Sequence, residues 1–345
     1  MTVSAARRGA ALLAAGALLL SGCAGQQASG LTRYEASFLT LFDTVTTIVG
    51  YAESETSFSA LVQPIHDELE EYHRLYDIYH DYPGLTNLKT VNDRAWASPV
   101  EVDGRILDLL LFCREVYGWS GGAVNAAMGS VLSLWHEART DGVDDPANAA
   151  LPSPAALTRA AAHTDFSCVV LDEDASTVRF TDRDLRLDVG AIAKGFALER
   201  VCQSAPSGLL ISVGGSLHAT GPKPDGSPWV AGIRDPEGGG DYLHTLYLSG
   251  GSLVTSGDYQ RRYTVNGVPY HHIIDPGTNM PGRRWRSVTV LCGDAALADA
   301  LSTALFLLSR EEGQTLLDNF GAQALWVDGT GGEAFSPGLS AHIRT

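Results

Sequence analysis

The stretch that decides the fold is RLDVGAIAKGFALER, residues 186–200. From Val178 to Val189, apolar and polar residues alternate, which predicts a strand. Gly190 breaks this pattern, and helical spacing resumes from Ala191 to Val201. The sequence therefore predicts a strand, a glycine turn and a helix in direct succession, with Asp188 at the end of the strand.

The start of this helix is a candidate phosphate site. A helix N-terminus presents free N–H groups and a partial positive charge, and Lys194 in the first turn adds a formal charge. Asp188 would lie beside both. The same residues fit a tight connection between strand and helix whose lysine points into water, and the stretch alone leaves both interpretations open.

The chain as a whole is strongly acidic. Its 345 residues carry 40 Asp and Glu against 24 Lys and Arg, a formal net charge of −16. This balance argues against broad attraction to nucleic acid, so we expect no nucleic-acid partner. An anionic ligand such as a nucleotide would bind only where local cations, a helix end or a metal ion reverse the sign.

The N-terminus predicts export. Arg7 and Arg8 form a basic region, and the apolar run from Gly9 to Leu20 is too short to span a bilayer. Residues 1–22 are therefore predicted to be a lipoprotein signal peptide. A plain secretory signal is the alternative.

Cys23 follows the signal in the string Leu-Ser-Gly-Cys and is predicted to carry the lipid. Residues 23–34 would form the lipidated cysteine and its tether, and residues 35–345 the catalytic domain. This predicts a lipid-anchored protein at the extracytoplasmic face of the cell membrane. The other cysteines show no CxxC spacing, which leaves a zinc or redox motif unsupported.

The remaining pattern predicts an α+β fold. Strands outnumber what simple βαβ winding needs, so we expect a single large domain of mostly antiparallel, mixed sheets with packed helices. Asn266-Gly267 is a strong hairpin signal, and Asp294 is a candidate N-cap. The expected strands lie within residues 34–51, 168–172, 177–180, 209–221, 229–233, 263–268 and 322–327. The expected helices cover residues 58–79, 103–119, a segment opening at Gly121-Gly122, 154–163 and 295–308, and residues 79–94 are expected to form a functional loop.

A carboxylate and a hydroxyl four residues apart, Asp299 and Thr303, form the best isolated signal for a metal site. Positions four apart share a helix face, and Ser302 lies near the edge of that face. Oxygen ligands completed by waters and substrate phosphates are the usual shell of Mg²⁺. The alternative is that Thr303 bonds back to its own helix while Asp299 faces solvent.

His272 is a candidate general base or a polar contact to a ligand ring. It lies where a predicted strand in HHIIDPGT, residues 271–278, runs into a turn. The Asp-Pro-Gly sequence of the turn explains Asp275 structurally, and a structural histidine is the alternative for His272. No P-loop, GxGxxG or HExxH string occurs, which removes the commonest NTPase, Rossmann and zincin interpretations.

Five ordered blocks of the chain resemble the ApbE-type FAD:protein FMN transferases. They are LDVGAIAKGFA (187–197), ISVGGSLHATG (211–221), TSGDY (255–259), HHIIDPGT (271–278) and LADALSTALFLL (297–308). NLKTVNDRA (87–95) and GGAVNAAMGSVLSLWHEAR (121–139) fit the same family, so the resemblance covers Phe38 to Val327.

The resemblance implies a T-fold-like enzyme that depends on Mg²⁺, or on Mn²⁺, and uses FAD as its substrate. Such an enzyme releases AMP and attaches FMN through a phosphoester to a Thr or Ser of an exported target protein. The metal ligands implied are Asp299, Thr303 and the main-chain carbonyl of Ala191, with Ser302 as a further candidate. His272 and Asp299 are the implied catalytic residues.

The resemblance also implies which residues contact FAD. Phe42 departs from the family, because many members have Met in a Met-Gly-Thr string where this chain has Phe-Asp-Thr. The implied FAD contacts are Phe42, Ala127, Met128, Gly129, Asp188, Lys194, His272 and Ile273.

Two other functions stay open at this stage. The same site could hydrolyse FAD to FMN and AMP, with water in place of the protein hydroxyl. A lipid-tethered, non-catalytic flavin-binding protein is the other alternative. The sequence does not give the acceptor protein, the number of metal ions, the general base or the oligomeric state.

Overall fold

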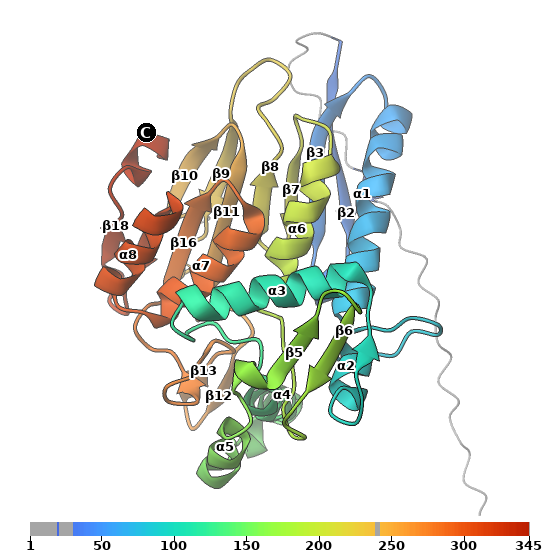
Figure 1. Ribbon diagram of the computed structural model, residues 1–345. Helices are drawn as coiled ribbons and strands as arrows, with labels where there is room; N and C mark the ends of the chain where they lie inside the picture. The colour runs from blue at the N-terminus through green and yellow to red at the C-terminus, as the bar shows by residue number, and fades with distance from the viewer. Residues whose placement is uncertain (1–18, 21–29, 239–241, 345) are drawn as a thin grey trace, which may run out of the picture.

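A broad antiparallel sheet runs through the upper part of the molecule (Figure 1). The computed structural model describes residues 19–20, 30–238 and 242–344. Within these residues the sheet has the order β1-β2-β3-β7-β8-β11-β16-β17-β18, and all neighbouring strands are antiparallel. The strands are β1 (Leu19–Leu20), β2 (Thr32–Phe38), β3 (Thr46–Ala52), β7 (Leu210–Val213), β8 (Ser216–Ala219), β11 (Gly251–Gly257), β16 (Ser287–Cys292), β17 (Gln323–Val327) and β18 (Glu333–Phe335).

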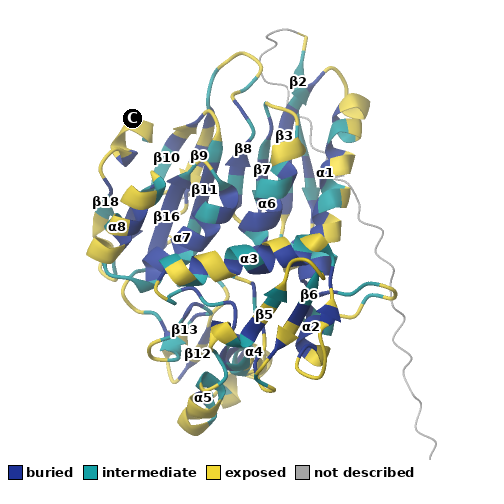
Figure 2. Ribbon diagram, in the orientation of Figure 1, coloured by how far each residue is buried: buried dark blue, intermediate teal, exposed yellow. Residues whose placement is uncertain are grey.

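Both faces of this sheet are covered because its strands alternate apolar side chains between the two sides. Val254 packs in the cluster that includes the helices, whereas Leu253 packs in the cluster that includes the β9–β10 hairpin. Figure 2 shows the strands and the inward sides of α6 and α7 buried, with exposed residues on the outer sides. The covering elements are α1 (Glu55–Tyr76), α6 (Ala193–Ser204), α7 (Ala295–Leu307), α8 (Arg310–Phe320), β9 (Trp229–Ile233) and β10 (His244–Leu248).

The lower part of the molecule in Figure 1 begins at the crossing helix α3 (Gly104–Trp119) and holds short sheets and helices. All its paired strands are antiparallel as well. Its helices are α2 (Leu88–Arg94), α3 (Gly104–Trp119), α4 (Gly129–Asp144) and α5 (Pro154–Ala161), and its strands are β4 (Val100–Glu101), β5 (Val169–Asp172), β6 (Thr177–Phe180), β12 (Tyr263–Val265), β13 (Val268–Tyr270), β14 (Ile274–Asp275) and β15 (Met280–Pro281). Short 3-10 turns occur at Leu41–Asp43, Pro146–Asn148, Phe166–Cys168 and Leu339–His342. The predicted α+β fold, a single domain with mostly antiparallel sheets, is confirmed.

The turn and the helix cap that the sequence predicts from single residues are both present in the structure. Asn266 and Gly267 have φ of 50° and 81° and form the tight turn of the β12–β13 hairpin. The Asp294 side chain accepts the Leu297 N–H at 2.8 Å, as expected of an N-cap.

Two expected boundaries are wrong. No helix opens at Gly121-Gly122, since both residues have positive φ and form a turn, and α4 begins only at Gly129. The expected loop over residues 79–94 ends in helix α2, whose N-cap is Asn87, with its side chain accepting the Thr90 N–H.

The predicted strand up to Val189 is also wrong, because β6 ends at Phe180. Beyond it the alternating apolar residues are buried, but the backbone forms only one isolated parallel bridge, between Arg186 and Met128, and no strand ladder. The Leu187 N–H and C=O bond instead to the Asn92 side chain at 2.7 and 2.9 Å, and the Asp188 N–H donates to Ala126. Alternation here reports an extended, half-buried chain rather than a ladder.

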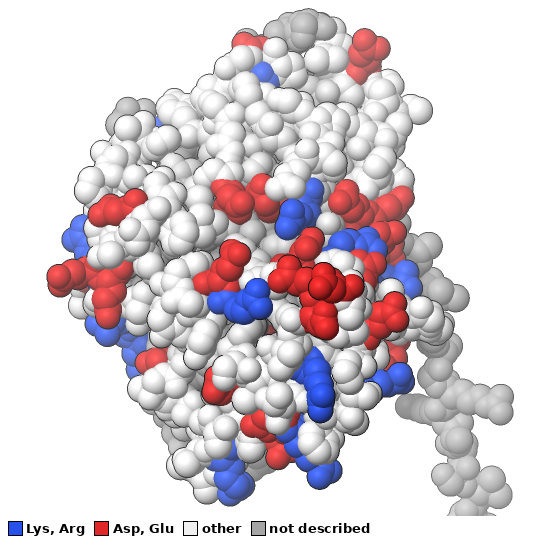
Figure 3. Space-filling view, viewed as in Figure 1, with Lys and Arg blue, Asp and Glu red and all other residues white. Residues whose placement is uncertain are grey.

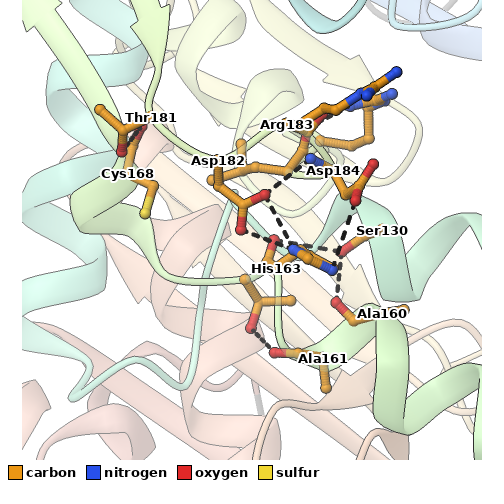
Figure 4. A network of polar contacts seen from close by, with 12 residues as sticks. Ser130, Ala160, Ala161, His163, Cys168, Thr181, Asp182, Arg183 and Asp184 are labelled. Atoms are coloured by element: carbon orange, nitrogen blue, oxygen red, sulfur yellow. Dashed lines mark hydrogen bonds and ion pairs between the residues drawn. The ribbon is translucent and has the colours of Figure 1, made fainter. Parts of the chain in front are cut away.

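The segment from β6 to Asp188 is anchored by the polar network in Figure 4. The His163 ring binds both carboxylate oxygens of Asp182, at 3.0 and 2.8 Å. On the other side, the Ser130 hydroxyl of α4 donates to the Ala160 carbonyl of α5 at 3.0 Å. These contacts tie α4, α5 and the segment that carries Asp188 into one unit.

Replacing Asp182 by asparagine should lower the free energy of unfolding at pH 7 by about 1 kcal/mol. Burial would raise the pKa of the Asp182 carboxyl, but hydrogen bonds from His163 and the Asp184 N–H outweigh it and hold that pKa low. This stability is present above the unfolded pKa near 3.8 and is lost as pH falls through the folded value. Urea unfolding should therefore show the difference shrinking below about pH 4. Asp184→Asn, whose carboxylate lies 3.9 Å from His163, is the control and should change little.

The predicted signal peptide (residues 1–22), Cys23 and the tether (23–34) lie outside the described residues, apart from Leu19–Leu20 and residues 30–34. The lipid anchor therefore stays a prediction. Among the helices that the structure describes, none combines the length and apolar character needed to cross a membrane.

Candidate active site

A cavity of about 370 Å³ lies where the main sheet and its helices meet the lower part of the molecule. Its walls come from segments that are far apart in the chain, including the β2–β3 connection, α4, β11 and α7. The predicted site residues that line it are Phe42, Met128, Asp188, Ala191, Lys194, His272, Ile273, Asp299 and Thr303. Ala127, Gly129 and Ser302 are fully or almost fully buried and do not line it.

Asp299 lies on α7 and is only 5% exposed. One carboxylate oxygen, Oδ2, accepts the Gly195 N–H at the start of α6 at 2.8 Å. Among the described residues, no Lys, Arg or His lies within ion-pair distance of this carboxylate. Burial raises its pKa, although the nearby Lys194 opposes the shift. One hydrogen bond offsets little of the desolvation free energy of a buried carboxylate, so the charged form is destabilising unless a cation binds beside it.

Hydroxyl groups surround the next turn of α7. The Ser256 hydroxyl of β11 lies 2.9 Å from the Ser302 hydroxyl and 3.3 Å from that of Thr303. It is Ser302 that donates back to the helix, to the Asp299 carbonyl at 2.9 Å. The Ser302 hydroxyl is thus engaged in hydrogen bonds and does not line the cavity, whereas Thr303 lines the cavity together with Asp299.

These residues fit a magnesium ion. Carboxylate, hydroxyl and carbonyl oxygens are the donors that Mg²⁺ takes from proteins, and it leaves part of its shell to water and phosphate. Asp299 and Thr303 supply two such donors at the cavity wall, and Ala191 lies at the same cavity in the turn before α6. The unpaired buried carboxylate is the observation that favours a cation here.

Gly195→Ala should destabilise the protein by about 1–3 kcal/mol through overpacking. A Cβ at Gly195 would lie 2.3 Å from the Asp299 Cβ and 2.5 Å from the Ala295 carbonyl oxygen, so α6 and α7 would have to separate. Urea unfolding measures the loss. Gly118→Ala in α3 is the matched control, because a Cβ there meets nothing within 4 Å and helix propensity should make it neutral or stabilising. Equal effects of both variants would contradict the tight crossing.

Asp188 and Lys194 flank the turn that precedes α6. The Asp188 carboxylate accepts the Gly190 N–H at 2.9 Å, and burial raises its pKa. The Lys194 ammonium donates to the Gly190 carbonyl at 3.3 Å and lines the cavity. The first turn of α6 therefore brings a formal positive charge to the same wall as the helix N-terminus, as the sequence predicted.

His272 presents an unpaired ring to the cavity. Its Nδ1 atom is buried and has no hydrogen-bond partner among the described residues. Burial, together with the positive charge of Arg261, lowers the pKa of His272 to about 3, so the ring is neutral at physiological pH. An orphaned, neutral imidazole at a cavity can accept a proton from a bound group.

The β2–β3 connection contributes a strained edge to the cavity. Phe42 and Asp43 have φ of 53° and 52°, in the left-handed region that non-glycine residues rarely adopt. The Phe42 N–H donates to the His73 ring at 3.2 Å, and the two rings meet edge to face. Strain of this kind is typical of ligand-binding sites.

Several lining residues were not singled out as site residues from the sequence. Tyr79 stacks on His136 at 5.1 Å between ring centroids, and Arg139 lies 3.0 Å from the same histidine. Arg261 lines the cavity from the loop after β11. Leu132, Trp135, His136 and Arg139 share one face of α4, a spacing that could have identified this wall.

Cationic side chains reach the cavity although the protein as a whole is acidic. Figure 3 shows Asp and Glu side chains gathered over the middle of one face, near α3. At the cavity, Lys194, Arg139 and Arg261 line the wall together with four aspartates, Asp43, Asp77, Asp188 and Asp299. A local group of cations is what an anionic ligand requires of a chain with net charge −16.

Two of the predicted residues, Ala127 and Gly129, are buried next to the cavity wall and hold its backbone in place through hydrogen bonds. The Gly129 N–H donates to the Arg186 carbonyl at 2.9 Å, and a Cβ at Gly129 would lie 2.6 Å from that oxygen. The Ala127 N–H donates to the Asn125 side chain at 2.8 Å. Of the three predicted residues Ala127, Met128 and Gly129, only Met128 lines the cavity.

Comparison with known proteins identifies the family. The family model described as the ApbE family matches residues 42–326. A Treponema pallidum (strain Nichols) protein named FAD:protein FMN transferase is 37% identical over 263 residues, which cover 70% of each chain. The crystal structure of the ApbE protein of Thermotoga maritima is 30% identical with a TM-score of 0.80, covering 91% of this chain and 100% of that one. The flavin transferase ApbE of Vibrio cholerae has the same fold, with a TM-score of 0.75 at 23% identity over 90% and 99% of the two chains. The resemblance seen in the sequence blocks is confirmed, and the chain belongs to the ApbE family.

Proposed function

We propose that this protein is an FAD:protein FMN transferase. It takes FAD, joins the FMN half through a phosphoester to a Thr or Ser hydroxyl of an exported target protein, and releases AMP. The observation that carries the proposal is the convergence of an unpaired buried carboxylate, a helix N-terminus with Lys194 and an orphaned His272 on one cavity. The name of the Treponema pallidum relative supports the transfer of FMN from FAD to a protein.

Asp299 and Thr303, with the main-chain carbonyl of Ala191, would hold Mg²⁺ in this site. A bound ion would supply positive charge to the phosphates and to the AMP leaving group. Lys194, in the first turn of α6, would bind the same phosphates through its ammonium group. The chain thereby holds the FMN phosphorus in line for the incoming hydroxyl.

His272 would take the proton of the acceptor hydroxyl. The hydroxyl oxygen forms the new bond to the FMN phosphorus as the bond from that phosphorus to the AMP oxygen breaks, and the proton ends on solvent or AMP. A ring nitrogen at the cavity that has no partner among the described residues supports this role. Asp275 is less suited, because its carboxylate is engaged by the Gly277 N–H at 2.8 Å in the turn.

The acceptor protein and the enzyme would meet outside the cytoplasm. The signal string ending at Cys23 is the support for a lipid anchor at the extracytoplasmic face of the membrane. Growth with radiolabelled palmitate should label the wild-type protein and leave a Cys23→Ser variant unlabelled.

The test of the reaction is incubation with FAD, Mg²⁺ and exported candidate acceptors, followed by in-gel flavin fluorescence and AMP quantification. Transfer predicts covalent flavin on an acceptor in a one-to-one ratio with AMP. AMP without covalent flavin would make the protein an FAD pyrophosphatase. Flavin binding with neither product would leave a non-catalytic flavin-binding protein.

A further inference from the structure

Helices α6 and α7 cap each other: a carboxylate on each helix accepts a backbone N–H from the first turn of the other helix. Asp299 of α7 accepts the Gly195 N–H of α6 at 2.8 Å, and Glu199 of α6 accepts the Ala295 N–H of α7 at 2.7 Å. The residues in each helix are four apart, one helical turn. The two carboxylates therefore form a reciprocal pair of caps across one antiparallel helix crossing.

Both contacts satisfy N–H groups that a helix cannot satisfy itself. The first four N–H groups of a helix have no partner within it. Ile192, the N-cap of α6, provides no side-chain hydrogen bond, so Asp299 supplies one from the neighbouring helix. At α7 the local cap Asp294 serves the Leu297 N–H, and Glu199 serves the Ala295 N–H.

Helices α6 and α7 are in close contact where they cross, so their relative position is tightly constrained. Gly195 packs so closely that an added Cβ would meet the Asp299 Cβ at 2.3 Å. Any slide of α7 along α6 would break the bond between Gly195 and Asp299 and turn the carboxylate within the cavity wall. One helical turn away, the bond from the Ala295 N–H to Glu199 also opposes a shift of α7 along α6. The second carboxylate oxygen of Glu199 accepts a hydrogen bond from the Gln203 side chain at 3.3 Å.

We propose that Glu199 is a positioning residue for the metal site: its bond to the Ala295 N–H sets the register of α7 on α6 and so aims the Asp299 carboxylate at the cation. This inference rests on the metal site of the proposed function. Partners that orient a metal ligand typically change metal affinity by about 10–100-fold when removed. The contact lies outside the cavity, since Glu199 does not line it.

The test measures Mn²⁺ binding directly, from the loss of the free-ion EPR signal, without flavin or turnover. Glu199→Ala should weaken Mn²⁺ binding about tenfold. Glu199→Gln keeps an oxygen for the Ala295 N–H and should restore affinity to within about twofold. Asp294→Ala is the matched control: it removes a cap from the same end of α7 but leaves the link to α6, so affinity should hold while stability falls.

The experiment distinguishes failure of the metal assignment from failure of the role proposed for Glu199. Wild-type protein that binds neither Mn²⁺ nor Mg²⁺ would overturn the metal assignment in the proposed function. Wild-type binding that Glu199→Ala leaves unchanged, or that Asp294→Ala weakens equally, would overturn the role of Glu199. Should Glu199→Ala fail to fold, Glu199→Asp decides: its shorter side chain keeps the charge but cannot span the contact, so unchanged affinity overturns the proposal and a severalfold loss supports it.

Discussion

Asp299→Asn should lower Mg²⁺-dependent FMN transfer by about a thousandfold or more, because it removes the only formal negative charge among the proposed metal donors. Charge stabilisation by a bound metal is worth several kcal/mol of barrier, and each 1.36 kcal/mol is about tenfold in rate. The asparagine oxygen can still accept the Gly195 N–H, so the crossing of α6 and α7 is retained. Removing a desolvated carboxylate should leave the unfolding free energy equal or higher.

The measurement is the initial rate of covalent flavin formation at saturating FAD and Mg²⁺, with urea unfolding on the same samples. Asp294→Asn is the control, since it also replaces an aspartate of the same helix region but keeps the cap, and Asp294 does not line the cavity. Wild-type rates in Asp299→Asn would remove this residue from the metal site.

His272→Ala should slow transfer by about 10²–10⁴-fold, the usual contribution of a general base, while FAD affinity changes little. The ring makes no hydrogen bond among the described residues, so its loss should cost little structure. Free imidazole should restore part of the rate, because it can enter the space left by the side chain. A variant that loses FAD binding and transfer in parallel would instead assign His272 to ligand contact.

The pH dependence gives a second test of the same role. Because the pKa of His272 is lowered to about 3, the base is already neutral at pH 5. At saturating Mg²⁺, kcat/KM should be nearly flat between pH 7 and pH 5. With a histidine of ordinary pKa near 6.5, kcat/KM would fall about 25-fold over that interval. Such an acidic limb, abolished in His272→Ala, would contradict the buried, neutral ring.

Local chemistry made much of the fold predictable. Asp294, Asn266-Gly267 and the apolar spacing of residues 295–308 each determine structure over a few residues, and all gave the observed elements. The strand predicted up to Val189 failed because its hydrogen bonds go to Asn92 and Ala126, which lie far away in the sequence. Periodicity reports which side of an extended chain is buried, and the partner of that chain is set by tertiary structure.

The site divides in the same way. Asp299 and Thr303 could be paired from their spacing on one helix, and the resemblance to the ApbE family implied that Asp188, Lys194 and His272 share one site. Arg139 and Arg261 could not be placed, because α4 and the loop after β11 meet only in the folded protein. The role of Glu199 was equally hidden, since a carboxylate four residues after Gly195 looks like any solvated helix residue until α7 is laid against it.

The most direct test of the central claim, that a cation held by α7 makes this acidic protein a receptor for the phosphates of FAD, is an FAD titration followed by flavin fluorescence. The titration is run in EDTA and in saturating Mg²⁺, with wild-type protein and Asp299→Asn. We predict that Mg²⁺ tightens FAD binding by at least about tenfold, about 1.4 kcal/mol, in wild-type protein and not in the variant. An FAD affinity that is the same with and without Mg²⁺, or a Mg²⁺ effect that survives in Asp299→Asn, would contradict the account.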